Sequence, residues 1–446
     1  MRGAILTAKH HDGFCLWPTR TTTHSIAASP WRDGKGDMVR EIAEACRRHG
    51  LEFGVYLSPW DRNHPSYGTA AYLDVYRAQL RELLTGYGPI FEVWHDGANG
   101  GDGYYGGARE TRRIDPRTYY DWPRTWELVR SLQPNAVIFS DVGPDVRWVG
   151  NEKGFANETN WATFAPVGPD GGAPAPGHVR TTESPTGHRG ADRWIPAECD
   201  VSIRPGWFWH EAENGKVKTP EQLFDLYFRS VGRGCNLLLN VPPDRRGRIH
   251  EADVAALDGF GDRVRSTFGR NLAAGARADA SNVRGKDRRF DASQVLDAAE
   301  LKFGPTEDKA ELLDAAELTA YAAGSGESAD ALRGRKFGPT AHDRETYWTT
   351  DDGVKDAVVV LTLPHETTFS VVRLREALAL GQRVEAFAID AWQGDGFAQQ
   401  ASGTTIGPSR LLRLEGPVTT SRVRLRITRA AASPAIAELS LLRAPN

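Results

Sequence analysis

Two kinds of segment in this sequence place acidic side chains beside aromatic residues. In the first, the apolar run Phe91 to Trp94 leads through His95 to Asp96, and Gly97 then lets the backbone turn away. In the second kind, Glu152 and Glu198 each lie close to tryptophans. Two carboxyl groups about 5 Å apart, one ionised and one protonated, can cleave a glycosidic bond with retention of configuration. We therefore take Asp96 as the nucleophile candidate, although Asp96 alone could equally be a helix N-cap.

Glu152 and Glu198 compete for the role of acid/base. Gly150 and Asn151 predict a loop that could swing Glu152 over a bound sugar. Nearby tryptophans would raise the pKa of Glu152 by desolvation, as a general acid requires. We favour Glu152 and keep Glu198 as the runner-up, because a strand follows Glu198 immediately. For either residue the alternative is a solvated loop carboxylate.

His10 and His11 suggest either a metal site or a sugar site. Adjacent residues of a strand point to opposite faces, so the two imidazoles are poorly placed to share one ion, and we expect no metal and no organic cofactor. Imidazole nitrogens both donate and accept hydrogen bonds, which suits the vicinal hydroxyls of a sugar. Tyr56, Trp60 and Trp94 could form an apolar wall for the methyl group of a deoxysugar. A core position is the alternative for each aromatic residue, and a buried structural role is the alternative for one histidine.

Short apolar runs alternate with helix-length patterns and would position these residues. The expected strands are Ala4 to Ala8, Phe53 to Ser58, Ile90 to Trp94, Ala136 to Ser140 and Asn236 to Val241. The expected helices are Asp37 to His49, Ala70 to Leu84, Pro116 to Leu132 and Pro220 to Gly232. This alternation predicts a parallel sheet covered on both faces, and a (β/α)8-like TIM barrel fits it best. In such a barrel the active-site residues lie at the C-terminal ends of the strands.

The barrel is expected to lack its first strands. Adding weaker candidates near Trp161 and at Val201 to Arg204 brings the expected strands to about six, whereas closure takes eight. The sequence opens directly after Met1 in a segment that has the pattern of a strand interior and no signal peptide. We therefore expect the missing strands to precede Met1.

A chain of 446 residues predicts two domains. We assign residues 1–268 to the catalytic barrel and residues 346–446 to a C-terminal β-sandwich, because short β-rich runs recur there between turns. Residues 269–345 form a connector and the start of the second domain. Two motifs are duplicated in it: Leu-Asp-Ala-Ala-Glu-Leu at 296–301 and 313–318, and Lys-Phe-Gly-Pro-Thr at 302–306 and 336–340.

The charge and composition exclude several function classes. Lys and Arg total 55 against 58 Asp and Glu, and no basic tract could neutralise a run of phosphates, so we expect no nucleic-acid partner. No apolar stretch reaches the roughly 20 residues of a membrane-spanning helix. The four cysteines lack CxxC spacing, so we expect buried free thiols. Thirteen tryptophans suit stacking on sugar faces.

Together, these segments resemble the family 29 glycoside hydrolases, the α-L-fucosidases. The resemblance covers roughly residues 1–268 and resumes at 347–353 and 403–407. Its motifs are the successive strand ends at 3–14, 54–60 and 94–97. The segments 140–152 and 200–208 are similar to the subgroup that prefers α-1,3- and α-1,4-linked fucose. Relatives begin earlier, with a segment that supplies two strands, a further histidine and a glutamate of the fucose pocket.

The resemblance implies a role for individual residues. It makes Asp96 the nucleophile and Glu152 the acid/base, and it places His10 and His11 in contact with fucose. Tyr56 and Trp94 match residues that line the fucose pocket. Arg147 and Arg204 would either contact the sugar or support the residues that do. His95 stands where Phe is commoner, so it would either alter the pKa of the nucleophile or face the barrel exterior.

The resemblance implies a retaining exo-α-L-fucosidase that acts by double displacement. Its substrate would be terminal α-1,3- or α-1,4-linked L-fucose on an oligosaccharide or glycoconjugate. The alternative is a catalytically inactive, carbohydrate-binding homologue with a truncated barrel. The sequence leaves the location of the protein unknown, and the resemblance suggests an extracellular or periplasmic one.

Overall fold

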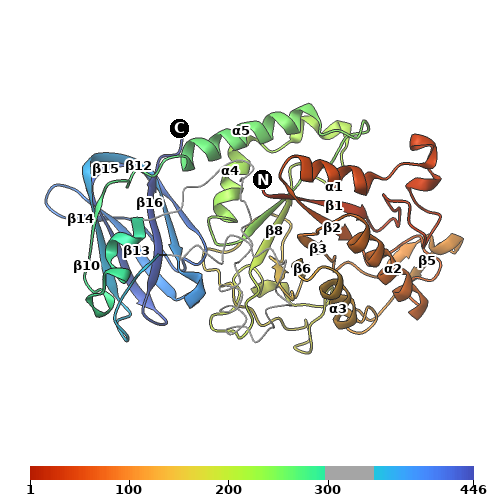
Figure 1. The fold of residues 1–446 in the computed structure, drawn as a ribbon, viewed down its shortest axis with the longest axis horizontal. Helices are drawn as coiled ribbons and strands as arrows, with labels where there is room; N and C mark the ends of the chain where they lie inside the picture. The colour runs from red at the N-terminus through yellow and green to blue at the C-terminus, as the bar shows by residue number, and fades with distance from the viewer. Residues whose placement is uncertain (297–345, 446) are drawn as a thin grey trace, which may run out of the picture.

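The computed structural model describes residues 1–296 and 346–445, which form an α/β half and an antiparallel β half (Figure 1). The α/β half holds a parallel sheet of seven strands in the order β1-β2-β3-β6-β7-β8-β9, with β1 and β9 at its edges. The strands are β1 (Gly3–Lys9), β2 (Glu52–Leu57), β3 (Glu92–Trp94), β6 (Val137–Ser140), β7 (Val146–Trp148), β8 (Ala197–Ser202) and β9 (Asn236–Asn240). The predicted parallel α/β sheet is confirmed. That the barrel lacks its first strands stays a prediction.

Five α-helices accompany this sheet within the described residues. They are α1 (Met38–Arg48), α2 (Ala70–Gly86), α3 (Trp122–Leu132), α4 (Pro220–Arg229) and α5 (Glu251–Phe268). Local signals define several helix starts: the Asp37 side chain accepts from the Arg40 amide, and Thr219 forms a capping box with Gln222. Short 3-10 helices occur at Ile26–Ala28, Trp31–Gly34, Tyr105–Gly107, Thr181–Glu183, Glu211–Lys216, Arg284–Lys286, Arg288–Phe290, Ala292–Leu296 and Leu378–Leu380.

Several predicted boundaries need correction. The weaker strand expected near Trp161 is wrong, because that residue lies in a loop where its amide donates to the Thr186 carbonyl. One strand of the parallel sheet, β7, was not predicted. It has only three residues, which are too few to show the alternation of apolar and polar side chains that marks a strand. The helix expected from Pro116 begins at Trp122, because Asp115 to Tyr119 form a turn instead.

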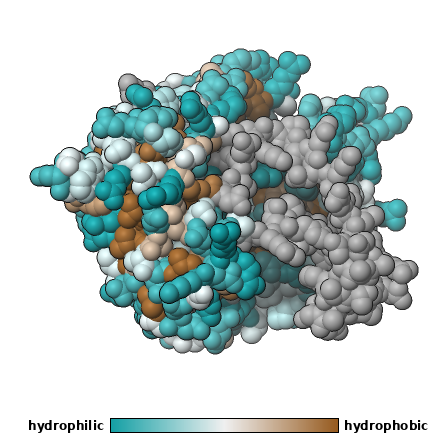
Figure 2. All heavy atoms as spheres, turned by 60° about the vertical axis from the view of Figure 1, so that its left-hand side comes forward, coloured by the Kyte–Doolittle hydropathy of each residue, from teal (hydrophilic) through white to brown (hydrophobic). Residues whose placement is uncertain are grey.

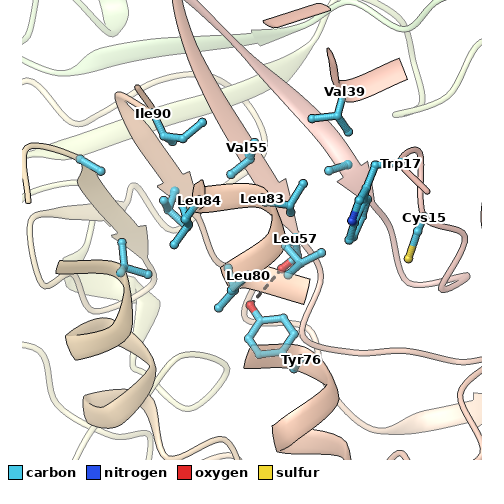
Figure 3. Packing of buried hydrophobic residues seen from close by; sticks show 14 of the residues in the cluster. Cys15, Trp17, Val39, Val55, Leu57, Tyr76, Leu80, Leu83, Leu84 and Ile90 are labelled. Atoms are coloured by element: carbon cyan, nitrogen blue, oxygen red, sulfur yellow. Dashed lines mark hydrogen bonds between the residues drawn. The ribbon is translucent and has the colours of Figure 1, made fainter. Parts of the chain in front are cut away.

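The core of the α/β half forms where helices pack on the sheet. Helix α2 buries Tyr76, Leu80 and Leu83, which lie close to Val55 and Leu57 of β2 in Figure 3. The Tyr76 hydroxyl donates to the Leu57 carbonyl over 3.1 Å, so the polar tip of this ring is satisfied inside the core. All four cysteines are free and buried, as predicted.

The C-terminal half is an antiparallel sheet built around two long, curving strands. Its members are β10 (Arg277–Ala280), β11 (Trp348–Thr349), β12 (Ala357–Glu376), β13 (Val384–Trp392), β14 (Phe397–Gly403), β15 (Arg410–Ala430) and β16 (Ala435–Leu442). The first part of β12 pairs with β10 and its last part with β16, while β15 pairs along both parts. The sheet thereby folds over a core of alternating apolar side chains, as a β-sandwich does. The short β-rich runs at 358–363 and 369–374 are not separate strands but parts of the single strand β12.

The two halves pack through a shared apolar cluster. Phe224 and Phe228 of α4 and Phe268 of α5 meet Val371 and Leu411 of the β half. The predicted division at residue 268 stays a prediction; it is supported by the end of α5 at that residue and by β10, which already belongs to the antiparallel sheet. The duplicated motifs fall almost wholly on residues 297–345, outside the described residues.

One short antiparallel pair projects beyond the parallel sheet: β4 (Gly101–Gly103) and β5 (Glu110–Arg112). The face in Figure 2 is mostly hydrophilic, with small scattered apolar areas. Within 1–296 and 346–445, none of the helices combines the length and the apolar character needed to cross a membrane.

We predict that Leu80→Ala lowers the free energy of unfolding by about 2–5 kcal/mol, because it leaves a cavity between α2 and the sheet. The Leu80 side chain is fully buried, whereas Leu380 is 38% exposed. Leu380→Ala is therefore the matched control, with an expected effect below about 0.5 kcal/mol. Urea unfolding followed by far-UV circular dichroism measures both, and equal losses in the two variants would contradict the assigned packing.

Candidate active site

The C-terminal ends of neighbouring parallel strands bring the predicted residues to one edge of the sheet. His10 and His11 follow β1, Trp60 follows β2, and Asp96 follows β3. Farther along the sheet, the loop after β7 carries Glu152. Because parallel strands end at the same edge, residues from distant parts of the chain meet there.

Two donors hold the Asp96 carboxylate in one orientation. The Tyr56 hydroxyl donates to Oδ2 over 2.7 Å, and the Ala98 amide donates to Oδ1 over 2.6 Å. The Asp96 side chain remains 23% exposed, so a ligand can reach it. Burial and the neighbouring Asp96 charge raise the pKa of Tyr56, which therefore stays protonated and keeps donating.

Three aromatic rings form a row across the strands beside Asp96. Tyr56 of β2 lies opposite Trp94 of β3, and Trp94 lies opposite Phe139 of β6. The ring centroids of Tyr56 and Trp94 are 5.3 Å apart, and those of Trp94 and Phe139 are 3.9 Å apart with nearly parallel planes. Because the rings stack on one another, this row, which we call the aromatic wall, presents apolar ring edges rather than one flat face.

The two histidines lie side by side, which corrects the expectation that they point to opposite faces. That expectation assumed an extended strand, but β1 ends at Lys9 and the chain turns after it, so the ring centroids are 4.1 Å apart. His10 stacks on Tyr56 at 5.7 Å, and His11 lies against Trp60 at 5.1 Å. Within 1–296 and 346–445, no three His, Cys, Asp or Glu side chains form a group that could hold a metal ion.

The hydrogen bonds of His11 define its tautomer. The Ser58 hydroxyl donates to the Trp60 carbonyl, which can only accept, so Ser58 must accept from Nδ1–H of His11 over 2.7 Å. The Nε2 atom is then unprotonated and lies 3.8 Å from Oδ2 of Asp96. Burial lowers the pKa of His11 to about 4, and burial also lowers the pKa of His10. At neutral pH, Nε2 of His11 is thus an acceptor that lies beside the Asp96 carboxylate and can bind a donor such as a sugar hydroxyl.

A buried lysine holds the loop that carries Trp60. The Lys9 ammonium contacts Asp61 at 3.3 Å and donates to the Tyr72 hydroxyl and the Gln79 amide oxygen over 3.0 and 2.9 Å. Asp61 in turn accepts from the amides of Asn63 and His64. A buried charge is tolerated only when it is paired in this way, so the network fixes the path of the loop after β2.

Glu152 lies on the exposed loop after β7. The indole N–H of Trp207 donates to its Oε2 over 3.3 Å. The next residue, Phe208, is 56% exposed, and its ring meets that of His10 edge-on at 5.1 Å. Because His10 stacks on Tyr56, and Tyr56 donates to Asp96, a continuous series of contacts connects the two carboxylates.

Glu198 lies inside the sheet. It is 1% exposed, and its two oxygens accept from the Trp94 indole over 2.8 Å and the Asn236 amide over 2.7 Å. Both oxygens are therefore used within the protein, unlike those of the exposed Glu152.

Arg147 and Arg204 are fully buried, and protein groups satisfy their guanidinium groups. Arg147 donates to the carbonyls of Ser184 and Trp161 and to other groups, and Arg204 forms a two-point ion pair with Asp253 of α5. Of the two roles left open for these residues, this arrangement favours support of the surrounding loops. His95 likewise faces away from the site, because its Nδ1 contacts the Tyr76 hydroxyl of α2 and burial lowers its pKa to about 3.

An open cavity of about 640 Å³ lies beside the site. Asp12, which follows His11, and Arg62, whose guanidinium lies over the Trp60 ring, form one side of it. The β4–β5 hairpin forms the other side through residues that include Asp102 and Glu110. The cavity is lined by charges of both signs and adjoins Trp60, so it can accept a polar ligand that extends beyond the aromatic wall.

Three further carboxyl groups lie near the site: Asp141 is half-buried, and Asp200 and Glu92 are buried. Burial raises the pKa of Asp141 to about 6 and that of Asp200 to about 7. Asp141 accepts from Gly177 and packs so closely on Gly97 that a Cβ there would lie 2.1 Å from its oxygen. Asp200 accepts from the Trp148 indole over 2.7 Å. The third is Glu92, and strand alternation could have placed it on the same face as Trp94.

Comparison with known proteins gives consistent results. Residues 1–266 match the family model described as alpha-L-fucosidase. Alpha-L-fucosidase 1 from Arabidopsis thaliana is 40% identical over 441 residues, which cover 98% of this chain and 75% of that protein. The structure of a glycoside hydrolase 29 family member from a rumen bacterium is 38% identical, with a TM-score of 0.77 over 100% of this chain and 67% of that one. A Ruminococcus gnavus family 29 fucosidase in complex with fucose is 29% identical, with a TM-score of 0.77 over 99% of this chain and 82% of that one.

We predict that His11 makes the protein less stable as the pH falls from about 6.5 to about 4. Its folded-state pKa is lowered from 6.5 to about 4, so within this range the unfolded chain binds a proton that the folded chain excludes. The free energy of unfolding should fall by up to about 1.4 kcal/mol per pH unit for this group. Urea unfolding across this range should show a shallower slope for His11→Asn, whereas His49→Asn, at an exposed position, should keep the wild-type slope. Parallel slopes for wild type and His11→Asn would contradict the prediction.

Proposed function

Because the chain belongs to the alpha-L-fucosidase family of glycoside hydrolases, we propose that it removes terminal L-fucose with retention of configuration, using Asp96 as the nucleophile. The observation that carries this proposal is the Asp96 carboxylate, held by Tyr56 and Ala98 at the end of an aromatic wall. The Asp96 side chain is 23% exposed, and its Oδ2 lies 3.8 Å from Nε2 of His11.

The proposed reaction has two displacements. Asp96 attacks the anomeric carbon while Glu152 gives its proton to the leaving glycosidic oxygen, which yields a fucosyl ester of Asp96. Glu152 then removes a proton from water, and that water attacks the anomeric carbon and releases fucose and the Asp96 carboxylate. Tyr56 orients the Asp96 carboxylate in the free enzyme. It also stabilises the negative charge that returns to Asp96 when the fucosyl ester is cleaved.

The surrounding residues would bind the sugar. His10 and His11 are neutral at neutral pH, and His11 presents Nε2 as an acceptor to a sugar hydroxyl. Tyr56, Trp60 and Trp94 supply apolar surface for the sugar ring and its methyl group. The R. gnavus relative of similar fold is described in complex with fucose, which supports fucose as the sugar.

The environments of the two glutamates favour Glu152 as the acid/base. A general acid must reach the glycosidic oxygen, and the exposed Glu152 on its loop is free to do so. A bound sugar would cover its carboxyl group and exclude water from it. Glu198 already uses both oxygens on Trp94 and Asn236.

We further propose that the fucose is linked α-1,3 or α-1,4 to a branched oligosaccharide or glycoconjugate. Two observations support this: the sequence similarity of segments 140–152 and 200–208 to that subgroup, and the polar cavity between Asp12, Arg62 and the β4–β5 hairpin. Arg62 of this cavity lies over the Trp60 ring, so the cavity can take the part of the glycan that extends past Trp60. Fucose release from a Lewis-type oligosaccharide, compared with an α-1,2-linked one, measures this preference.

We predict that Asp96→Gly lowers kcat on a nitrophenyl fucoside by about 10³-fold or more, because no group remains to attack the anomeric carbon. Azide should then restore turnover and form a fucosyl azide of inverted configuration, which nuclear magnetic resonance identifies. Asp115→Gly, a change at an exposed loop carboxylate, is the control and should keep wild-type kcat. Full activity of Asp96→Gly would exclude the proposed nucleophile, and binding of fucose by a wild-type protein without turnover would favour an inactive binding protein.

We predict that Glu152→Ala is sensitive to the leaving group. Fucosyl transfer from a dinitrophenyl fucoside, whose leaving group needs no protonation, should stay within about 10-fold of wild type, whereas release from an oligosaccharide should fall by about 10²–10⁴-fold. Azide should accelerate turnover of the activated substrate and give a fucosyl azide of retained configuration. If Glu198→Ala shows this pattern and Glu152→Ala does not, the acid/base assignment is reversed.

A further inference from the structure

Two buried glutamates that the proposed reaction does not use meet inside the parallel sheet. Glu92 of β3 is 4% exposed and Glu198 of β8 is 1% exposed. Strands β6 and β7 separate β3 from β8 in the sheet, so contact between the two side chains has to cross its concave side. The sheet therefore curves enough at this point to bring non-adjacent strands together.

Glu92 and Glu198 are close enough to interact, and two carboxyl groups can share a hydrogen bond only when one of them carries a proton. Burial and the neighbouring Glu198 raise the pKa of Glu92 to about 9, so Glu92 is protonated at neutral pH and donates to Glu198. The other Glu92 oxygen has no partner among the described residues, as expected of a group that remains neutral.

Glu198 is the acceptor at the centre of this group. Besides Glu92, it accepts from the indole N–H of Trp94 over 2.8 Å and from the side-chain amide of Asn236 over 2.7 Å. Burial raises the pKa of Glu198, and the hydrogen bonds from its three donors act against this shift because they favour the ionised form. The three donors come from two strands, β3 and β9, so Glu198 connects them.

Glu198 is connected to the Asp96 carboxylate through Trp94 and Tyr56. The indole of Trp94 is stacked between Tyr56 and Phe139, and Tyr56 donates to Asp96. Stacking leaves a ring free to slide and to rotate in its plane, whereas a directional bond at Nε1 removes that freedom. The bond to Glu198 thereby determines where the Trp94 ring lies beside Tyr56.

We propose that Glu198 and Glu92 are positioning residues: ionised Glu198, held by protonated Glu92, fixes the Trp94 indole in the sugar-binding wall and against Tyr56. This inference rests on the proposed function only in taking Trp94 as part of the sugar-binding surface. It explains why a carboxylate, rather than an apolar residue, stands at the buried position 198.

The proposal predicts an asymmetry between two conservative substitutions. In Glu92→Gln the new amide N–H₂ can donate to Glu198 as the protonated acid did, so the arrangement is kept. In Glu198→Gln a single amide oxygen replaces two charged acceptors, and the new N–H₂ faces the donors of Glu92, Trp94 and Asn236. At least one buried donor then loses its partner.

The test compares both variants in L-fucose binding by calorimetry and in turnover of two substrates. We expect Glu92→Gln to stay within about 3-fold of wild type in Kd and kcat/KM, and Glu198→Gln to lose about 10-fold or more in both, in keeping with the net contribution of a hydrogen bond to a charged group. The loss should be the same for a dinitrophenyl fucoside and an oligosaccharide, and azide should not reverse it. Near-UV circular dichroism checks that each variant is folded.

A second measurement uses wild-type protein and the conservative variant, so it does not depend on the folding of Glu198→Gln. The infrared difference spectrum between wild type and Glu92→Gln at pH 7 should show the carbonyl stretch of a protonated carboxylic acid, because the contribution of other protonated groups such as Asp200 is common to both proteins and cancels. The proposal is overturned by equal losses in both variants, by wild-type binding in Glu198→Gln, or by the absence of this band. A leaving-group-dependent, azide-rescued Glu198→Gln would instead make Glu198 the acid/base. Since fucose binding and the infrared band require no turnover, failure of the proposed reaction at Asp96 leaves both readouts interpretable.

Discussion

The hydrogen bond between the Tyr56 hydroxyl and the Asp96 carboxylate joins β2 to the end of β3, and the rest of the site is arranged around it. Tyr56 can donate only if its ring is held in place, and its neighbours hold it: His10 stacks on one side and Trp94 on the other. The same contacts leave the His11 face of Asp96 open. One bond between adjacent strands thus places a negatively charged oxygen next to aromatic rings and neutral imidazoles.

Buried polar groups stabilise this arrangement from behind. Lys9 and Asp61 hold the loop that carries Trp60, and Glu198, which neighbours Glu92, accepts from the indole of Trp94. Each group loses water on burial, and each regains hydrogen bonds only in one geometry. An apolar core of similar volume would tolerate small shifts, whereas these networks do not, so they restrict the side chains that face the proposed substrate.

The sequence predicted the elements whose pattern is local. Helices α1, α2 and α4 carry apolar residues at helical spacing, and β1, β2 and β6 are apolar runs bounded by polar residues. The short strand β7 and the burial of Arg147 were not predictable in this way, because three residues show no period and an arginine is usually exposed. The relation of His10 to His11 was also mispredicted, since the turn after Lys9 depends on neighbours from other parts of the chain.

By itself, the sequence determined which residues can do chemistry, that they follow strands, and that parallel strands would carry them to one edge of a sheet. It also contains the family motifs, because these are contiguous. Only the tertiary structure decided what surrounds each carboxyl group: exposed for Glu152, enclosed with three donors for Glu198, and bonded to Tyr56 for Asp96. The physical reason is that the solvation and the hydrogen bonds of a carboxyl group come from residues far away in the chain, which curvature of the sheet brings within reach.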